Sequence, residues 1–118
     1  MTLQRGDIGV ARFPHTAGAR GKKRPVVVVQ ADTYNGKVRS VIVAEVTTNL
    51  ADANDPAYLL IDISTPDGKA TGLLHNSVVS CLWLASVNAD RLEPILGKLS
   101  DALLSKLDDC LRAALGLP

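Results

Sequence analysis

The chain has 118 residues and a mass of 12.5 kDa, which is room for one domain of common size, residues 1–118. Hydrophobic residues make up 47% and charged residues 21%, which excludes a disordered chain. No apolar run approaches the roughly 20 residues of a membrane span. The first residues reach Asp7 without an apolar secretory segment, so we expect a cytoplasmic protein that does not enter the membrane.

The net charge of +1 hides a strong asymmetry along the chain. Residues 1–40 carry eight basic and two acidic side chains, an excess of six positive charges, and the remainder carries an excess of five negative charges. This division is consistent with an anion-binding N-terminal half and equally with a solvated basic loop beside an acidic helix.

The two cysteines, Cys81 and Cys110, lie in apolar stretches without neighbouring Cys or His at metal-ligand spacing. We therefore expect buried free thiols and neither a disulfide framework nor a zinc site. The sequence contains no motif that calls for a metal ion or another cofactor.

The first half of the chain reads as strands separated by turns. Alternating apolar residues predict a strand over 7–13, and the polar, glycine-containing segment 14–24 predicts a loop. Four valines after Pro25 predict a strand over 25–30. A third strand is expected over 40–46, followed by a polar loop over 49–56.

The second half continues this pattern and ends in a helix. Strands are expected over 57–63, 77–84 and 95–99, with turn chemistry at 65–68 and one helical turn near 88–92. Ser100 as N-cap, leucines at helical spacing and Gly116 as a stop predict a C-terminal helix. The fold class is therefore mainly β (α+β), with about six short strands forming a small barrel against that helix.

In this order, several short motifs make the chain resemble the MazF/PemK family of toxin endoribonucleases from bacterial toxin–antitoxin pairs. They extend over essentially the whole chain. They are Arg5-Gly6-Asp7-Ile8, Arg24-Pro25 followed by four valines, Val46-Thr47-Thr48-Asn49, Gly72-Leu73, Ser77-Val78-Val79, Arg91-Leu92, Gly97-Lys98-Leu99-Ser100 and Leu115-Gly116-Leu117.

The resemblance implies an SH3-like barrel of the CcdB/PemK toxin type with a C-terminal helix, a homodimer, and metal-independent cleavage of single-stranded RNA such as mRNA at a specific sequence. In that reaction the ribose 2′-hydroxyl attacks the adjacent phosphate and leaves a 2′,3′-cyclic phosphate and a 5′-hydroxyl. The resemblance also implies a cognate antitoxin protein whose disordered tail covers the RNA groove.

The resemblance assigns catalytic roles to Arg24 and Thr47. A guanidinium is always charged and offers a fork of donors to the phosphate oxygens, and a hydroxyl at the end of a strand can donate another hydrogen bond. Thr48 is the adjacent candidate for RNA contact, but alternation along a strand lets only one of the two threonines face the groove.

The general base is harder to assign. Many family members carry a carboxylate in the loop before Arg-Pro, and here no acid lies between Asp7 and Asp32. The Arg and Asp that others place on the later strand are replaced in the stretch 80–86 by uncharged residues. We therefore interpret His15, an ordinary base in the loop next to Arg24, as the general base.

Basic residues near Arg24 are expected to contact the RNA backbone. Phe13 at the edge of the loop, and Tyr34 after the second strand, are the candidates for stacking on bases. Trp83 lies among apolar residues and is interpreted as part of the core or of a dimer interface. The expected backbone contacts are Arg12, Arg20, Lys22 and Lys23.

Two alternatives remain open at this point. One is a toxin of the same fold that binds a protein, as gyrase-poisoning CcdB relatives do. The other is a nucleic-acid-binding relative that has kept the groove and lost the chemistry, and it predicts salt-dependent RNA binding without product.

Overall fold

The computed structural model describes residues 2–13 and 22–118. Its elements in chain order are β1 (Asp7–Arg12), β2 (Lys23–Val28), β3 (Ser40–Thr47), β4 (Tyr58–Ile61), α1 (Pro66–Lys69), β5 (Ser77–Asn88), the 3₁₀ turn η1 (Ala89–Arg91), β6 (Ile95–Lys98) and α2 (Asp101–Leu115). Most of the predicted strands and both predicted helical segments are therefore confirmed. The predicted loop over 14–24 lies largely outside the described residues.

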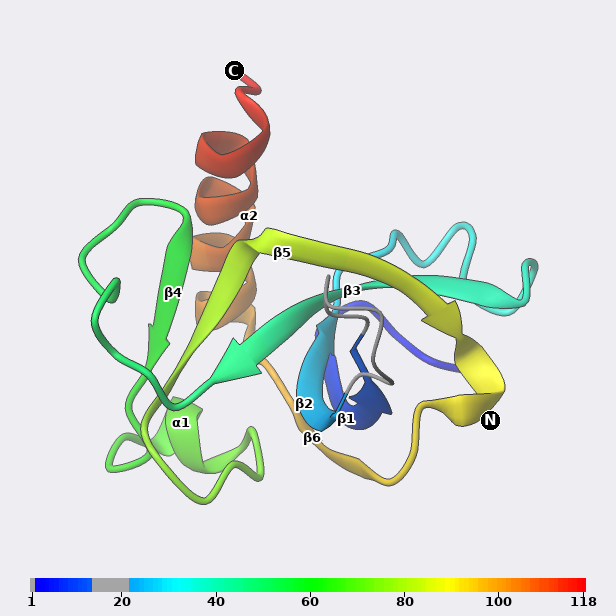
Figure 1. The fold of residues 1–118 in the computed structure, drawn as a ribbon, viewed down its shortest axis with the longest axis horizontal. Helices are drawn as coiled ribbons and strands as arrows, with labels where there is room; N and C mark the ends of the chain where they lie inside the picture. The colour runs from blue at the N-terminus through cyan, green and yellow to red at the C-terminus, as the bar shows by residue number, and fades with distance from the viewer. Residues whose placement is uncertain (1, 14–21) are drawn as a thin grey trace.

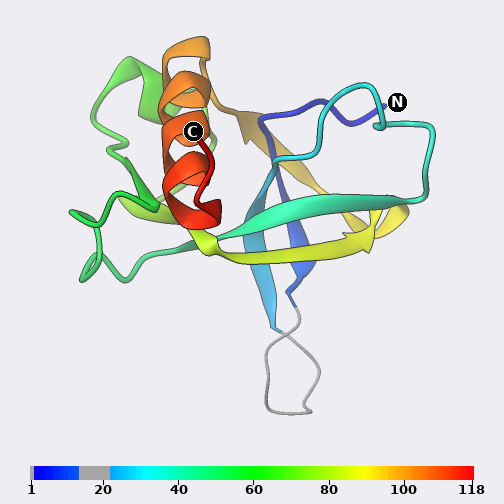
Figure 2. The same ribbon diagram turned by 90° about the horizontal axis from the view of Figure 1, so that it is seen from above.

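The strands form one curled antiparallel sheet in the order β4-β5-β3-β2-β1-β6, a half-barrel with α2 beside β4 and β5 (Figure 1). The mainly β, SH3-like class with a C-terminal helix is thus confirmed. Seen from above, the β1–β2 hairpin projects beneath the long β3–β5 pair (Figure 2). β6 is the edge strand beyond β1, which fits the proline that precedes it.

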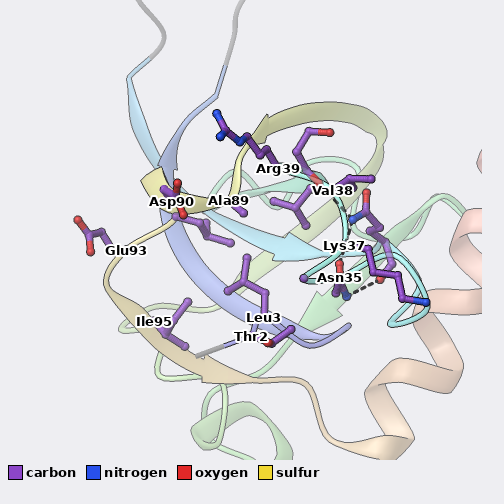
Figure 3. Close-up of a pocket in the computed structure, with 15 residues that line it drawn as sticks. Thr2, Leu3, Asn35, Lys37, Val38, Arg39, Ala89, Asp90, Glu93 and Ile95 are labelled. Carbon is purple, nitrogen blue, oxygen red and sulfur yellow. Dashed lines mark hydrogen bonds between the residues drawn. The ribbon is translucent and has the colours of Figure 1, made fainter.

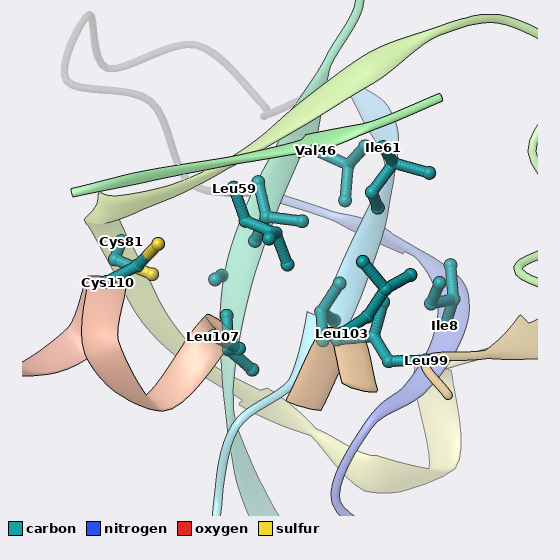
Figure 4. Packing of buried hydrophobic residues seen from close by; sticks show 12 residues of the cluster. Ile8, Val46, Leu59, Ile61, Cys81, Leu99, Leu103, Leu107 and Cys110 are labelled. Carbon is teal, nitrogen blue, oxygen red and sulfur yellow. The ribbon is translucent and has the colours of Figure 1, made fainter. Parts of the chain in front are cut away.

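Both faces of the central strands are buried, which explains why they read as runs of valine rather than as an alternating pattern. Val27 and Ala44 belong to the cluster that receives α2, whereas Val26, Val28 and Val43 belong to a second cluster on the opposite face. Figure 4 shows the first cluster, with Leu103, Leu107 and Cys110 of α2 turned toward the sheet.

Local chemistry sets the ends of α2 as predicted. The Ser100 hydroxyl accepts a hydrogen bond from the Leu103 backbone N–H at 3.2 Å. Gly116 takes a left-handed conformation with φ of 70°, which glycine adopts without steric cost, and its N–H donates to the Arg112 carbonyl. These caps fix where the apolar face of the helix starts and stops.

Arg5 of the Arg5-Gly6-Asp7 motif links three parts of the described chain through hydrogen bonds and an ion pair. The Arg5 backbone N–H donates to Asp32 Oδ1 at 2.7 Å, and its side chain reaches the Val29 carbonyl and the Asp108 carboxylate. Two hydrogen bonds to the carboxylate hold the pKa of Asp32 below its usual value. The one from the Arg5 backbone N–H has the larger effect, and the one from the Asn35 side chain has the smaller. Arg5 thereby ties the N-terminal turn to the β2–β3 connection and to α2.

Three local predictions need correction. The turn at 65–68 is instead the one-turn helix α1, capped by the Thr65 hydroxyl, with Pro66 in its first turn. β2 begins at Lys23 rather than at Pro25, because it pairs with β1 over that length. β5 continues past Leu84 to Asn88. Its register with β3 shifts between Ala44, which lies opposite Leu84, and Glu45, which lies opposite Ser80, and β5 pairs with β3 on both sides of this shift.

Cys81 and Cys110 are buried free thiols, as predicted, and their sulfurs lie side by side in Figure 4. Burial raises the pKa of the Cys81 thiol to about 12, and it also raises the pKa of Cys110. Both side chains therefore act as small apolar core residues at neutral pH.

Leu107 offers a test of how α2 packs against the sheet. Leu107 is fully buried, so Leu107→Ala should lower the free energy of unfolding by about 2–5 kcal/mol through lost burial and a cavity. Leu115→Ala, at a position on the same helix that is 55% exposed, is the matched control and should change it by less than about 0.5 kcal/mol. Equal losses measured by urea denaturation would contradict this docking of the helix.

Candidate functional site

The pairing of β2 with β3 puts Arg24 and Thr47 on the same face of the sheet. Val26 lies opposite Glu45 and Val28 opposite Val43. Side chains alternate along a strand, so Arg24 shares the face of Val26, and Thr47 shares the face of Glu45. A guanidinium and a hydroxyl that are distant in sequence thus lie on one face, near the ends of two paired strands.

Thr47 rather than Thr48 belongs to this face. Thr47 is half-buried, and its Oγ1 accepts a hydrogen bond from the Asn49 backbone N–H at 3.2 Å. That contact uses the oxygen as an acceptor, so the hydroxyl hydrogen remains available as a donor to an anionic oxygen. Thr48 is exposed and follows the end of the strand.

Of the residues predicted to contact the RNA backbone, the structure describes Arg12, Lys22 and Lys23. Arg12 and Lys23 lie directly opposite each other on β1 and β2, and both are exposed, as is Lys22. Like charges in this arrangement repel each other, and an anion placed between them would offset that repulsion. By strand alternation they point away from the face of Arg24. Arg20 and His15 lie outside the described residues.

A cavity of about 500 Å³ adjoins this basic pair. It opens between the ends of the β1–β2 hairpin and the last residues of β5. Its polar lining consists of Arg12, Lys23, Ser86, Asn88, Asp90, Arg91 and Glu93. Cations outnumber carboxylates there by three to two, and amide and hydroxyl groups supply further hydrogen-bonding capacity.

The prediction that Phe13 stacks on a base is wrong for this structure. Its side chain is 1% exposed and packs in the second cluster against Val26 and Val28, so neither ring face is open. Tyr34 is 57% exposed, but it lies in the β2–β3 connection, at the other end of β2 from Arg24. Trp83 is 43% exposed, so it is not a core residue of the single chain, and its place in a dimer interface stays a prediction.

Sequence reasoning missed Glu45, a buried carboxylate on the face shared by Arg24 and Thr47. The signal was present, because Glu45 is the one charged residue in the apolar strand 40–47. A strand with one wet face would have placed it in solvent. Its burial follows from long-range packing, which the sequence pattern does not display.

Two polar atoms on the same face are buried and have no hydrogen-bond partner among the described residues. They are Arg24 Nε and the Oγ of Ser80, which lies opposite Glu45 on β5. Buried polar groups are almost always satisfied in native proteins. Arg24 Nε and Ser80 Oγ are exceptions to this rule among the described residues.

A second cavity, of about 530 Å³, lies at the Ser40 end of β3 and shares Asp90 and Glu93 with the first (Figure 3). Lys37 and Arg39 contribute two positive charges there, and Asp90 and Glu93 contribute two negative charges. β3 separates this cavity from Thr47 by about 23 Å at the usual rise per residue. Its balanced charge does not favour a polyanion.

Two absences concern residues 2–13 and 22–118, the part of the chain that the structure describes. No group of three or more His, Cys, Asp or Glu side chains there is arranged to hold a metal ion. No helix of that part of the chain is long and apolar enough to cross a bilayer.

Comparison with known proteins gives the class of the molecule. Residues 4–115 match the family described as PemK-like, MazF-like toxin of type II toxin–antitoxin system. The chain is 30% identical to Endoribonuclease EndoA of Bacillus subtilis (strain 168), across 99% of this chain and 97% of that protein. It is 31% identical to Endoribonuclease MazF6 of Mycobacterium tuberculosis, across 99% and 100%.

Solved structures agree with this class. A mycobacterial endoribonuclease in complex with its cognate antitoxin matches with a TM-score of 0.78 at 22% identity, over 98% of this chain and 97% of that one. The toxin MazF-mt6 of Mycobacterium tuberculosis matches with a TM-score of 0.77, over 95% and 98%. The chain belongs to the PemK-like, MazF-like toxin family, which confirms the resemblance read from the sequence.

Two serines of β5 test whether the Ser80 hydroxyl is an unsatisfied group. Ser80→Ala removes a buried hydroxyl without a partner and should raise the free energy of unfolding by about 1 kcal/mol or leave it unchanged. Ser77→Ala, the matched control, removes a hydroxyl that donates to the His75 carbonyl at 2.8 Å and should cost about 1 kcal/mol. A loss at Ser80 as large as at Ser77 would show that the Ser80 hydroxyl is bonded in the folded protein.

Proposed function

We propose that this protein is the toxin of a type II toxin–antitoxin system and acts as a sequence-specific endoribonuclease on single-stranded RNA. The observation that carries the proposal is the match of residues 4–115 to the PemK-like, MazF-like toxin family. Arg24 and Thr47, which lie on one face of the neighbouring strands β2 and β3, support it. The curated relatives EndoA and MazF6 are both named endoribonucleases.

The proposed chemistry uses the substrate's own nucleophile. The ribose 2′-hydroxyl attacks the neighbouring phosphorus, and the bond from phosphorus to the 5′-oxygen breaks, which leaves a 2′,3′-cyclic phosphate and a 5′-hydroxyl. Arg24 stabilises the negative charge that develops on the phosphate oxygens, and the Thr47 hydroxyl donates to one of them. A base must accept the proton of the 2′-hydroxyl, and no step requires a metal ion.

Residues around the β1–β2 hairpin extend the site along the RNA backbone. Lys22, Lys23 and Arg12 are exposed there and offer positive charge to successive phosphates. Arg20 remains a predicted contact of the same kind, as does Thr48 beside Thr47. With Phe13 buried, base stacking has to come from other side chains.

A small antitoxin protein is the proposed partner, since one solved relative is an endoribonuclease bound to its cognate antitoxin. Two copies of the chain are expected to form a homodimer. Exposed apolar side chains, Trp83 and Leu82 among them, are available for burial in such an interface. We place the activity in the cytoplasm, where mRNA is the accessible substrate.

A CcdB-like gyrase inhibitor of the same fold is the second candidate. A gyrase inhibitor needs no pair of side chains that bind a phosphate group. The described chain has such a pair, Arg24 and Thr47, on one face of the sheet. The matched curated relatives are named for RNA cleavage. The endoribonuclease is therefore the function that we favour.

Arg24→Ala tests the proposed activity directly. The protein is incubated in EDTA with a long single-stranded transcript of mixed sequence, and product ends are analysed chemically. The parent should release discrete fragments with cyclic-phosphate ends, and Arg24→Ala should cleave about 10²–10³-fold more slowly because charge on the phosphate is no longer stabilised. Arg39→Ala, which removes the same side chain at the opposite end of β3, should cleave like the parent.

Salt dependence tests the hairpin contacts separately from the chemistry. Binding of a non-cleavable 2′-O-methyl RNA should weaken as salt rises, because cations released from the phosphates drive association. Replacing Lys22 and Lys23 by Ala should lower the slope of log affinity against log salt by about 1.4 in magnitude, or about 0.7 per contact. An unchanged slope in filter binding would remove these lysines from the RNA path.

A further inference from the structure

The cavity of about 500 Å³ beside the β1–β2 hairpin, called the hairpin cavity from here on, has no part in the cleavage chemistry proposed above. It lies one strand away from Arg24, because Ala11, which lines it, is directly opposite Arg24 in the β1–β2 register. Opposed residues of an antiparallel pair have Cα atoms about 4.5–5.5 Å apart. An RNA strand that contacts Arg24 through a phosphate can therefore place a neighbouring nucleotide in the hairpin cavity.

The wall of the hairpin cavity across from the hairpin is an open sheet edge. β4 pairs only with the first four residues of β5, so residues 84–88 have β3 as their one partner strand in the described chain. The Ala89 N–H donates to the Arg39 carbonyl at 2.8 Å. Because hydrogen-bonded positions alternate along an antiparallel pair, Ser86 and Asn88 turn their backbone N–H and C=O groups away from β3. Both residues line the hairpin cavity, where these groups can bind a ligand.

Two carboxylates, those of Asp90 and Glu93, are held at the rim of the hairpin cavity by hydrogen bonds of their backbones. The Asp90 N–H donates to Asn88 Oδ1 at 2.9 Å, and the Glu93 N–H donates to the Val10 carbonyl at 3.0 Å. Leu92, between the two acids, is 4% exposed and packs in the second cluster. Figure 3 shows both acids on the segment that follows β5. The backbone is thus fixed while the carboxylates stay exposed.

Charged side chains of both signs line the hairpin cavity without pairing with one another. Lys23 and Arg91 share this space with Asp90 and Glu93, yet no ion pair joins any of these four within the described part of the chain. All four are exposed. A ligand that carries both an anionic group and hydrogen-bond donors would find complementary partners here. A nucleotide is such a ligand, because it has a phosphate and because three of the four RNA bases have an amino group.

An extended acidic peptide is the alternative occupant, because a strand can be added at an open sheet edge. Two observations favour a nucleotide. The hairpin cavity adjoins Arg24, and Lys23, which lines it, already belongs to the proposed RNA path. Asp90 and Glu93 would repel acidic side chains, whereas they can accept hydrogen bonds from a base.

We infer that the hairpin cavity binds one nucleotide next to the cleavage site and prefers a base with an amino group over uracil. The inference rests on the proposed endoribonuclease function and deepens it. Lys23 and Arg91 bind the phosphate of this nucleotide. Asp90 and Glu93 accept hydrogen bonds from the amino group of the base. Uracil has no amino group, and two carbonyl oxygens flank its one ring N–H, so the carboxylates repel that edge of the base.

The test maps the cleavage sites of the parent and of the double variant Asp90→Asn/Glu93→Gln in a pool of random-sequence single-stranded RNA, in EDTA. At one position beside the cut, the parent should favour adenine, cytosine or guanine over uracil by about 5–150-fold, the usual range for a good contact to a base. The double variant should lower this preference to less than about threefold, because an amide can also donate to the carbonyl oxygens of uracil. A preference that the double variant keeps overturns the inference.

Arg91→Ala tests the phosphate contact separately from the base contact. The variant should bind RNA more weakly whichever base is present, and its slope of log affinity against log salt should be smaller in magnitude by about 0.7. Asp109→Asn exchanges a carboxylate for an amide on the exposed side of α2 and is the matched control for the two acids. It should keep the base preference and the salt slope of the parent. An unchanged salt slope in Arg91→Ala removes Arg91 from the site.

Binding of 2′-O-methyl oligonucleotides tests the hairpin cavity without cleavage. Oligo(C) and oligo(U) of equal length differ at the base edge that carries the amino group of cytosine. The parent should bind oligo(C) more tightly, and Asp90→Asn/Glu93→Gln should bind the two nearly alike. Equal affinities in the parent overturn the inference. A parent that cleaves no RNA overturns the proposed function, and this binding comparison still decides what the cavity binds.

A ten-residue glutamate peptide tests the alternative occupant. The parent should not bind this peptide in the hairpin cavity. Binding that is lost in Lys23→Ala/Arg91→Ala, together with equal affinities of the parent for oligo(C) and oligo(U), would assign the cavity to an acidic peptide and overturn the nucleotide site.

Discussion

The antiparallel register between β2 and β3 is the constraint on which the site depends. It puts Arg24 of β2 and both Glu45 and Thr47 of β3 on one face of the sheet. A slip by one residue would turn every one of these side chains to the opposite face. The register is fixed because both faces are buried, with Val27 in one cluster and Val26 in the other, so a slip would exchange their partners.

The far end of the β2–β3 pair is fixed by side chains. Gln30 donates to the Ser40 carbonyl and to Asn35, and it accepts a hydrogen bond from the Ile42 backbone N–H. Asn35 in turn donates to Asp32, which accepts from Arg5. This buried polar network joins the β2–β3 connection to the N-terminal turn. The strands are thus fixed at one end by hydrogen bonds, and their other end presents the reactive groups.

The two faces of the central strands differ in what covers them. On one face, Leu103 and Leu107 of α2 complete a continuous apolar core against the sheet. On the other, the valines of the second cluster lie on the same face as the polar side chains of Arg24, Glu45 and Thr47. The helix-covered face is therefore the scaffold on which the polar face is held.

Local signals in the sequence were sufficient for the elements of the fold and for the family. Valine runs, turn residues and cap chemistry predicted the strands and α2, because these features act over a few residues. The motifs around Arg24 and Thr47 named these two residues as site candidates, and their roles stay predictions. Local signals did not predict α1, because the same residues signal a turn and a single helical turn.

Burial and adjacency were decided only by the tertiary structure. Phe13 is enclosed, Trp83 is exposed, and β5 extends to Asn88, because each outcome depends on which distant segment covers or pairs with the residue. Glu45 shows the same limit most clearly. The sequence displays an acid within a strand, but only long-range pairing of β2, β3 and β5 makes it a buried neighbour of Arg24, since side chains remote in sequence meet through registers that no local pattern encodes.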